Sequence, residues 1–112
     1  MATEIRFVDE KTIRRLFNEA RYAERAQTGE FTEQVLYEEE PSHRSRQSRG
    51  TRSQRVAWFD TTGGYMATVH QFLRADGSLA ASGLPDPKRV RIGSITYVLA
   101  EKKQRWRLFG RG

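Results

Sequence analysis

Five arginines lie close together in the middle of the sequence, within the segment 41–55: Arg44, Arg46, Arg49, Arg52 and Arg55. Ser, Thr, Gln and Gly separate them, and the segment contains no Asp or Glu. A guanidinium group offers a planar fork of N–H donors that fits phosphate oxygens, and polar, flexible spacers let each fork reach its own phosphate. The segment therefore predicts binding to a polyanion. The alternative is a solvated loop that folds back on the acidic run 38–40.

A second set of arginines lies in the C-terminal third and alternates with other residues: Arg89, Arg91, Arg105 and Arg107. Because successive side chains of a strand point to opposite faces, this alternation predicts a sheet with one arginine-bearing face. Such a face, bordered by aromatic rings, supplies charges for a phosphate backbone and stacking surfaces for bases. The alternative is that these charges only protect edge strands from further pairing. Trp58 and Trp106 are expected in the core rather than on this face.

Side chains suited to catalysis or metal binding are scarce. The sequence has no cysteine and two histidines, His43 in the arginine-rich segment and His70. His70, Glu33 and Arg74 have the chemistry of the base, acid and cation of a small ribonuclease, but nothing in their spacing requires this role. A structural histidine on a half-buried strand is the better interpretation of His70. We therefore assign no catalytic residue, no metal site and no cofactor.

A helix is the first element expected to position these groups, over residues 9–27. Asp9 can accept the free N–H groups of the first turn, and Thr28-Gly29 follows as a stop signal. Apolar residues recur at helical spacing and form one stripe, which should pack on the rest of the domain: Ile13, Leu16, Phe17, Ala20 and Ala23. A basic ridge runs along another face: Arg14, Asn18, Arg21 and Arg25. Pairing with acidic neighbours is at least as good an interpretation of this ridge as anion binding.

Strands are expected in the remainder of the chain. The segment 30–40 is compatible with a strand or with a further helical turn, and 41–55 lacks apolar residues other than Pro41, which predicts a mobile loop. The period then changes to two, so that 56–59 and 65–74 form a hairpin. The segment 80–87, with two prolines, is a structured loop or an edge.

The sharpest local prediction is a hairpin of 89–92 and 95–100 around Gly93-Ser94, in which Ile92 faces Ile95. A turn at 101–104 and a further strand at 105–109 would follow. In this register one face of the sheet joins the core: Val90, Ile92, Ile95, Tyr97, Leu99, Trp106 and Leu108. Arg89, Val98 and Arg107 line up on the other face.

Length and charge limit the classes of protein that these residues can form. The 112 residues suffice for one domain, and 20 Lys and Arg against 14 Asp and Glu give a net charge of +6. The positive charge lies in the second half of the chain. Apolar runs of four or five residues are too short to span a bilayer, so no membrane is expected, and the lack of cysteine suits the cytoplasm.

The sequence thus predicts a single α+β domain over 1–112, with an N-terminal amphipathic helix packed on an antiparallel sheet of about five strands. The sheet would be a meander that can curl toward a small barrel. The leading hypothesis for function is non-catalytic binding of RNA or DNA, with weak sequence preference. The alternative is an interaction module or accessory subunit that docks an acidic partner protein, and a small ribonuclease or toxin-like enzyme ranks third. An edge strand at 105–109 would also permit a dimer.

Overall fold

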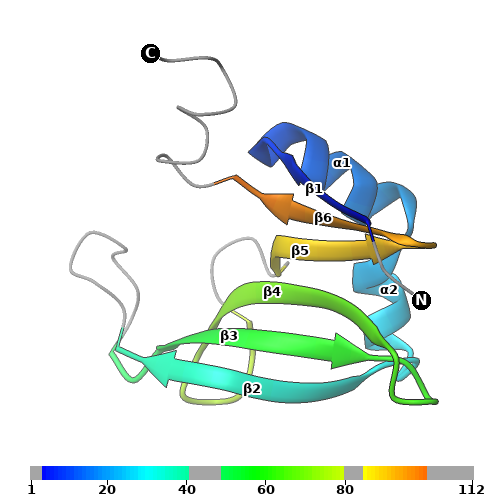
Figure 1. Ribbon diagram of the computed structural model, residues 1–112. Helices are drawn as coiled ribbons and strands as arrows, with labels where there is room; N and C mark the ends of the chain where they lie inside the picture. Colours follow the sequence, from blue (N-terminus) through cyan, green and yellow to red (C-terminus); the bar gives the residue numbers. More distant parts are fainter. Residues whose placement is uncertain (1–3, 41–48, 80–84, 101–112) are drawn as a thin grey trace, which may run out of the picture.

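The described part of the chain forms one six-stranded sheet and two helices. The computed structural model describes residues 4–40, 49–79 and 85–100. In chain order the elements are β1 (Glu4–Val8), α1 (Glu10–Glu19), α2 (Tyr22–Gln27), β2 (Thr32–Glu39), β3 (Arg52–Phe59), β4 (Tyr65–Leu73), β5 (Asp86–Ile92) and β6 (Ile95–Leu99). Both helices lie on the same side of the sheet (Figure 1). The α+β class expected from the sequence is therefore confirmed.

The sheet differs from the expected five-stranded antiparallel meander. Its order is β1-β6-β5-β4-β3-β2, so β2 to β6 do form an antiparallel meander, but β1 adds a sixth strand parallel to β6. The prediction missed β1, although Glu4-Ile5-Arg6-Phe7 alternates polar and apolar residues, because the strand is short and its partner β6 lies about 90 residues later in the chain. The suggestion of a barrel is wrong, because β1 and β2 lie at opposite edges and the sheet stays open.

The helical region is divided in two, which corrects the single helix expected over 9–27. The Asp9 side chain caps α1 by accepting a hydrogen bond from the backbone N–H of Thr12 at 2.8 Å. After Glu19 the chain turns at Arg21, whose φ of 58° is left-handed. The turn brings Tyr22 into the core, where its hydroxyl donates to the backbone carbonyl of Arg91. Burial of the Tyr22 ring offsets the strain of the turn.

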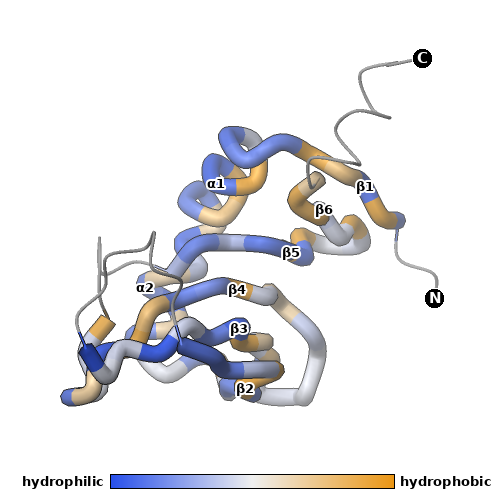
Figure 2. Tube along the Cα trace, turned by 90° about the vertical axis from the view of Figure 1, so that its left-hand side faces the viewer, coloured by the Kyte–Doolittle hydropathy of each residue, from blue (hydrophilic) through white to orange (hydrophobic). Residues whose placement is uncertain are grey.

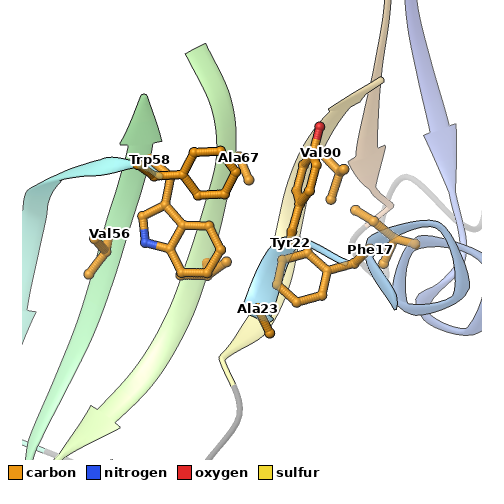
Figure 3. Packing of buried hydrophobic residues seen from close by; sticks show 10 residues of the cluster. Phe17, Tyr22, Ala23, Val56, Trp58, Ala67 and Val90 are labelled. Atoms are coloured by element: carbon orange, nitrogen blue, oxygen red, sulfur yellow. The ribbon is translucent and has the colours of Figure 1, made fainter. Parts of the chain in front are cut away.

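Aromatic rings join the helices to the sheet. The Trp58 ring, 1% exposed, stacks against Phe17 of α1 and Phe31, with centroid distances of 5.9 Å and 5.7 Å. Figure 3 shows Phe17 and Tyr22 facing Trp58 and Val90 across the layer between helices and strands. The core position of Trp58 is therefore confirmed. Trp106, like the expected strand at 105–109, lies outside the described residues.

The pairing of β5 with β6 confirms the register that the sequence predicts. Ile92 lies opposite Ile95, Val90 opposite Tyr97 and Arg89 opposite Val98. The strands at 30–40, 56–59 and 65–74 are also present, as β2, β3 and β4. However, β3 already begins at Arg52, so the sheet includes four residues that the sequence pattern assigned to the loop. Side chains of Gln54 and Ser53 are buried there, which the polar composition of the segment did not indicate.

Candidate anion-binding face

The face of the sheet turned away from the helices gathers Arg55 of β3 and the basic residues of β5. One row of directly paired residues crosses all six strands on this face: Phe7, Val98, Arg89, Thr68, Ala57 and Gln34. A neighbouring row on the same face contains His70, Arg55 and Tyr37. We call this surface the open face. Arg91 belongs to it as well, two residues beyond Arg89 along β5.

A hollow lies on the open face. Its volume is about 510 Å³, and eight residues line it: Phe7, Leu36, Arg55, Thr68, Lys88, Arg89, Val98 and Leu99. Phe7 and Leu36 come from the two edge strands, which in a flat six-stranded sheet would lie about 24 Å apart. The sheet is therefore bent around the hollow. β-Bulges in three successive strand pairs, at Val35/Tyr37, Trp58/Phe59 and Thr68/Val69, account for the bend.

Arg55 is a partly buried cation of the open face. Its guanidinium lies over the Tyr37 ring, 5.7 Å from the ring centroid. The Nε atom is buried and has no hydrogen-bond partner within the described part of the chain. An unpaired, buried N–H of a charged group is costly, and most such groups in proteins have an acceptor. The side chain is thus suited to an anion that enters the hollow.

Three further cations of β5 differ in their surroundings. Arg89 is exposed. Arg91 is held at the end of the strand, because its Nε–H donates to the carbonyl of Gly93 at 3.1 Å. Lys88 forms an ion pair with Asp86, with 3.0 Å between Nζ and Oδ2, and Asp86 also binds Arg14 of α1. The open face therefore owes its charge chiefly to Arg55, Arg89 and Arg91.

His70 is bound within the open face rather than presented to a substrate. Its Nε2 lies 2.7 Å from the hydroxyl oxygen of Ser53, and its ring meets the Phe72 ring edge-on at a centroid distance of 4.8 Å. Burial lowers the pKa of the imidazole, and the nearby Lys88 and Arg55 charges lower it further, against the opposing charges of Asp86 and Glu39. The lowered pKa favours the neutral imidazole. This environment fits the structural role that the sequence favoured.

Of the other arginines named from the sequence, the two that the structure describes do not join this group. Arg49 is exposed in the turn before β3, and Arg52 points to the helix-covered side, where its Nε lies 3.7 Å from a carboxylate oxygen of Glu38. Arg44, Arg46, Arg105 and Arg107 lie outside the described residues. Of the five candidate arginines in the described part of the chain, the structure brings together Arg55, Arg89 and Arg91.

The basic ridge of the helical region is neutralised by acidic partners. Arg14 pairs with Asp86 across 72 positions of sequence, and Arg25 pairs with Glu30 at 2.5 Å. Arg21 pairs with Glu24 at 3.2 Å. These contacts agree with the interpretation of the ridge as a paired surface.

Sequence reasoning missed the rings and apolar residues of the site. Phe7 and Tyr37, 43% and 46% exposed, flank the hollow from opposite edges, and Leu36 lies beside Tyr37. In Figure 2 the hydrophilic β5 lies next to the more hydrophobic β6, and β1 lies on the far side of β6. No local signal places Phe7 there, because its neighbour Val98 is about 90 residues away in sequence. Tyr37 directly precedes the acidic run 38–40, which is the one hint that it faces solvent.

The chain matches no known protein-family model, no curated protein and no solved structure. Its function must therefore be argued from the geometry of the open face. Within residues 4–40, 49–79 and 85–100, no three His, Asp or Glu side chains come together as a metal site would require. Neither helix in that part of the chain has the length and apolar character needed to cross a bilayer.

Proposed function

We propose that the protein binds single-stranded RNA or DNA through the open face, without catalysis and with weak sequence preference. The observation that carries this proposal is the gathering of Arg55, Arg89 and Arg91 with two exposed rings on the one sheet face that the helices leave uncovered. The net charge of +6 would draw polyanions toward the domain. The lack of cysteine suits a reducing compartment such as the cytoplasm.

A single strand fits this surface better than a duplex does. Phe7 and Tyr37 offer ring faces for stacking, which a strand with unpaired bases can use and a base-paired duplex cannot. The open face is also concave, and the described residues contain no helix that projects from it toward a groove. Arginines that contact phosphates carry little sequence information, which is the reason to expect weak preference.

A second candidate function is docking of an acidic partner protein. Both edge strands expose apolar side chains, including Ile5 of β1 and Val35 of β2, and such residues also contribute to protein interfaces. The arginines of the open face would then attract the acidic partner and orient it as it approaches. This candidate predicts no measurable affinity for isolated oligonucleotides at low salt.

The test is binding of labelled oligonucleotides across a salt series, with the wild type and the double variant Arg89→Ala/Arg91→Ala. Each phosphate contact on a single strand contributes a slope of about −0.7 to log K against log [salt]. Three arginines therefore contribute about −2.1 to the slope, which corresponds to an affinity loss of about 18-fold between about 50 and 200 mM salt. In the double variant only Arg55 remains, so the contribution of the three positions to the slope falls to about −0.7. Contacts from other segments add equally to both slopes, so the expected difference is about 1.4.

The matched control is Lys11→Ala/Arg15→Ala, which removes the same two charges from the exposed side of α1. This control should keep the wild-type slope. Equal losses in both double variants would mean that only net charge matters and would refute a contact surface on the open face. A duplex that binds more tightly than the matching single strand would contradict the role of the rings.

A further inference from the structure

The hollow on the open face has an unusual mixture of lining groups. Four of its eight lining residues are apolar, Phe7, Leu36, Val98 and Leu99, and the other four are polar or charged. A lipid chain would require a largely apolar, enclosed site, whereas a flat ring that carries an acidic group matches a half-polar hollow. The volume of about 510 Å³ lies in the range typical of small-ligand sites.

Arg55 supplies the polar anchor of this hollow. Its buried Nε–H lacks an acceptor among the described residues, and the Tyr37 ring beneath the guanidinium restricts its orientation. An anion at this position would satisfy the Nε–H and neutralise a half-buried charge in one step. Phosphate and carboxylate oxygens are the acceptors that a guanidinium fork prefers.

A second arginine reaches the same hollow from two strands away. Arg89 lies opposite Thr68, which lies opposite Ala57, and Arg55 precedes Ala57 by two residues. The strand spacing and the rise per residue place the Cα atoms of Arg55 and Arg89 about 12 Å apart on one face. Two arginine side chains can span that distance when they converge on one phosphate. Asp86, which lies on the same strand as Arg89, is already paired with Arg14 and Lys88.

We propose that the hollow holds one unstacked nucleotide of the bound strand. Arg55 and Arg89 bind its phosphate, and its base lies against Leu36 and Phe7. This inference rests on the proposed function and makes it more specific, because it assigns one nucleotide to the hollow while the rest of the strand crosses the open face. It follows that a free mononucleotide binds the same hollow, weakly and in competition with the strand.

The experiment titrates the full chain with uridine 5′-monophosphate and adenosine 5′-monophosphate, followed by NMR or calorimetry. Arg55→Met keeps the apolar stem of the side chain and removes its charge and donors, and we expect it to weaken mononucleotide binding at least about tenfold. Arg52→Met is the matched control, because it removes the same charge from the same strand but on the helix-covered side. This control should bind mononucleotides as the wild type does.

A second variant guards against a loss of folding at Arg55. Leu36→Glu places a carboxylate at the rim of the hollow, at a side chain that is 48% exposed, so the core stays intact. The new carboxylate should compete with phosphate for Arg55 and weaken mononucleotide binding as well. Inorganic phosphate and octanoate serve as the other two probes, and both should bind more weakly than a mononucleotide.

The outcomes separate this inference from the proposed function. Equal affinity for mononucleotides in the Arg55→Met and Arg52→Met variants would overturn the assignment of the hollow. A wild-type protein that binds long single strands but no mononucleotide would also overturn it, and the proposed function would stand. Octanoate binding that depends on Arg55, without any affinity for oligonucleotides, would overturn both. Phosphate binding as tight as that of a mononucleotide would show that the base is not held.

Discussion

Truncation of Trp58 should lower the stability of the fold, whereas truncation of Tyr37 should weaken binding to the open face. Trp58 is 1% exposed, whereas Tyr37 is 46% exposed on the open face. A buried aromatic side chain removes about 150–250 Å² from water, which at about 25 cal/mol/Å² corresponds to about 4–6 kcal/mol as an upper limit. Measured truncations of such residues cost about 3–5 kcal/mol. We therefore expect Trp58→Ala to lower the free energy of unfolding by about 4 kcal/mol.

The assay is urea unfolding followed by far-ultraviolet circular dichroism. With a denaturant dependence of about 2 kcal/mol per M, Trp58→Ala should lower the midpoint by about 2 M. Tyr37→Ala should cost about 1 kcal/mol or less, because its ring is already half in water, and should instead weaken oligonucleotide binding.

A conservative variant covers the case in which Trp58→Ala does not fold. Trp58→Phe keeps a ring between Phe17 and Phe31 and loses the hydrogen bond from Nε1 to Glu33, 3.0 Å long, at an expected cost of about 1–2 kcal/mol. A cost below about 1 kcal/mol for Trp58→Ala would refute the central position of this ring in the core.

Three further predictions concern single residues. The pKa of His70 is below its unfolded value of 6.5, so the folded state resists protonation and its stability should fall as pH drops below 6.5. The His70→Gln variant should show a weaker pH dependence of stability in unfolding curves measured from pH 7.5 to about 5. Gly64→Ala should lower the melting temperature, because the added Cβ would lie 2.9 Å from the Asp60 carboxylate; an unchanged melting temperature would contradict that contact. Asp86→Asn removes the ion pair of Lys88 beside the hollow, so oligonucleotide affinity should rise and the slope of log K against log [salt] should steepen by up to about 0.7. A weaker affinity would contradict the orientation of Lys88.

The elements that the sequence predicts well are those whose partners are close in the chain. The β5–β6 hairpin has a two-residue turn at Gly93-Ser94 and apolar residues on both sides, so turn chemistry and alternation lead to the same register. The N-terminal end of α1 is equally local, because Asp9 caps a helix only three residues away. In contrast, the apolar stripe continues through Ala20 and Ala23, so nothing in its period indicates the turn at Arg21.

The site was predictable only in part, for the opposite reason. Alternation along β5 identifies Arg89 and Arg91 as residues of one face. Phe7 and Leu36, in contrast, are brought to the hollow by strand pairing and a bulge that no local pattern shows. Phe7 reaches it through the parallel pairing of β1 with β6. Leu36 reaches it because a bulge bends β2 at that position. Likewise, the charge of Arg14 is neutralised by a partner that no local pattern can reveal.

The parallel pairing of β1 with β6 also sets an order of events during protein synthesis. β1 leaves the ribosome first, yet its one partner strand ends at Leu99, about 90 residues later. At about 5–20 residues per second, the first strand waits about 5–18 s for its place in the sheet. During that time Ile5 and Phe7 have no β6 beside them, and the hollow lacks one wall. The wall that Phe7 and Val98 form together can therefore arise only after β6 has been made, so a nascent chain that stops before β6 should lack the complete hollow.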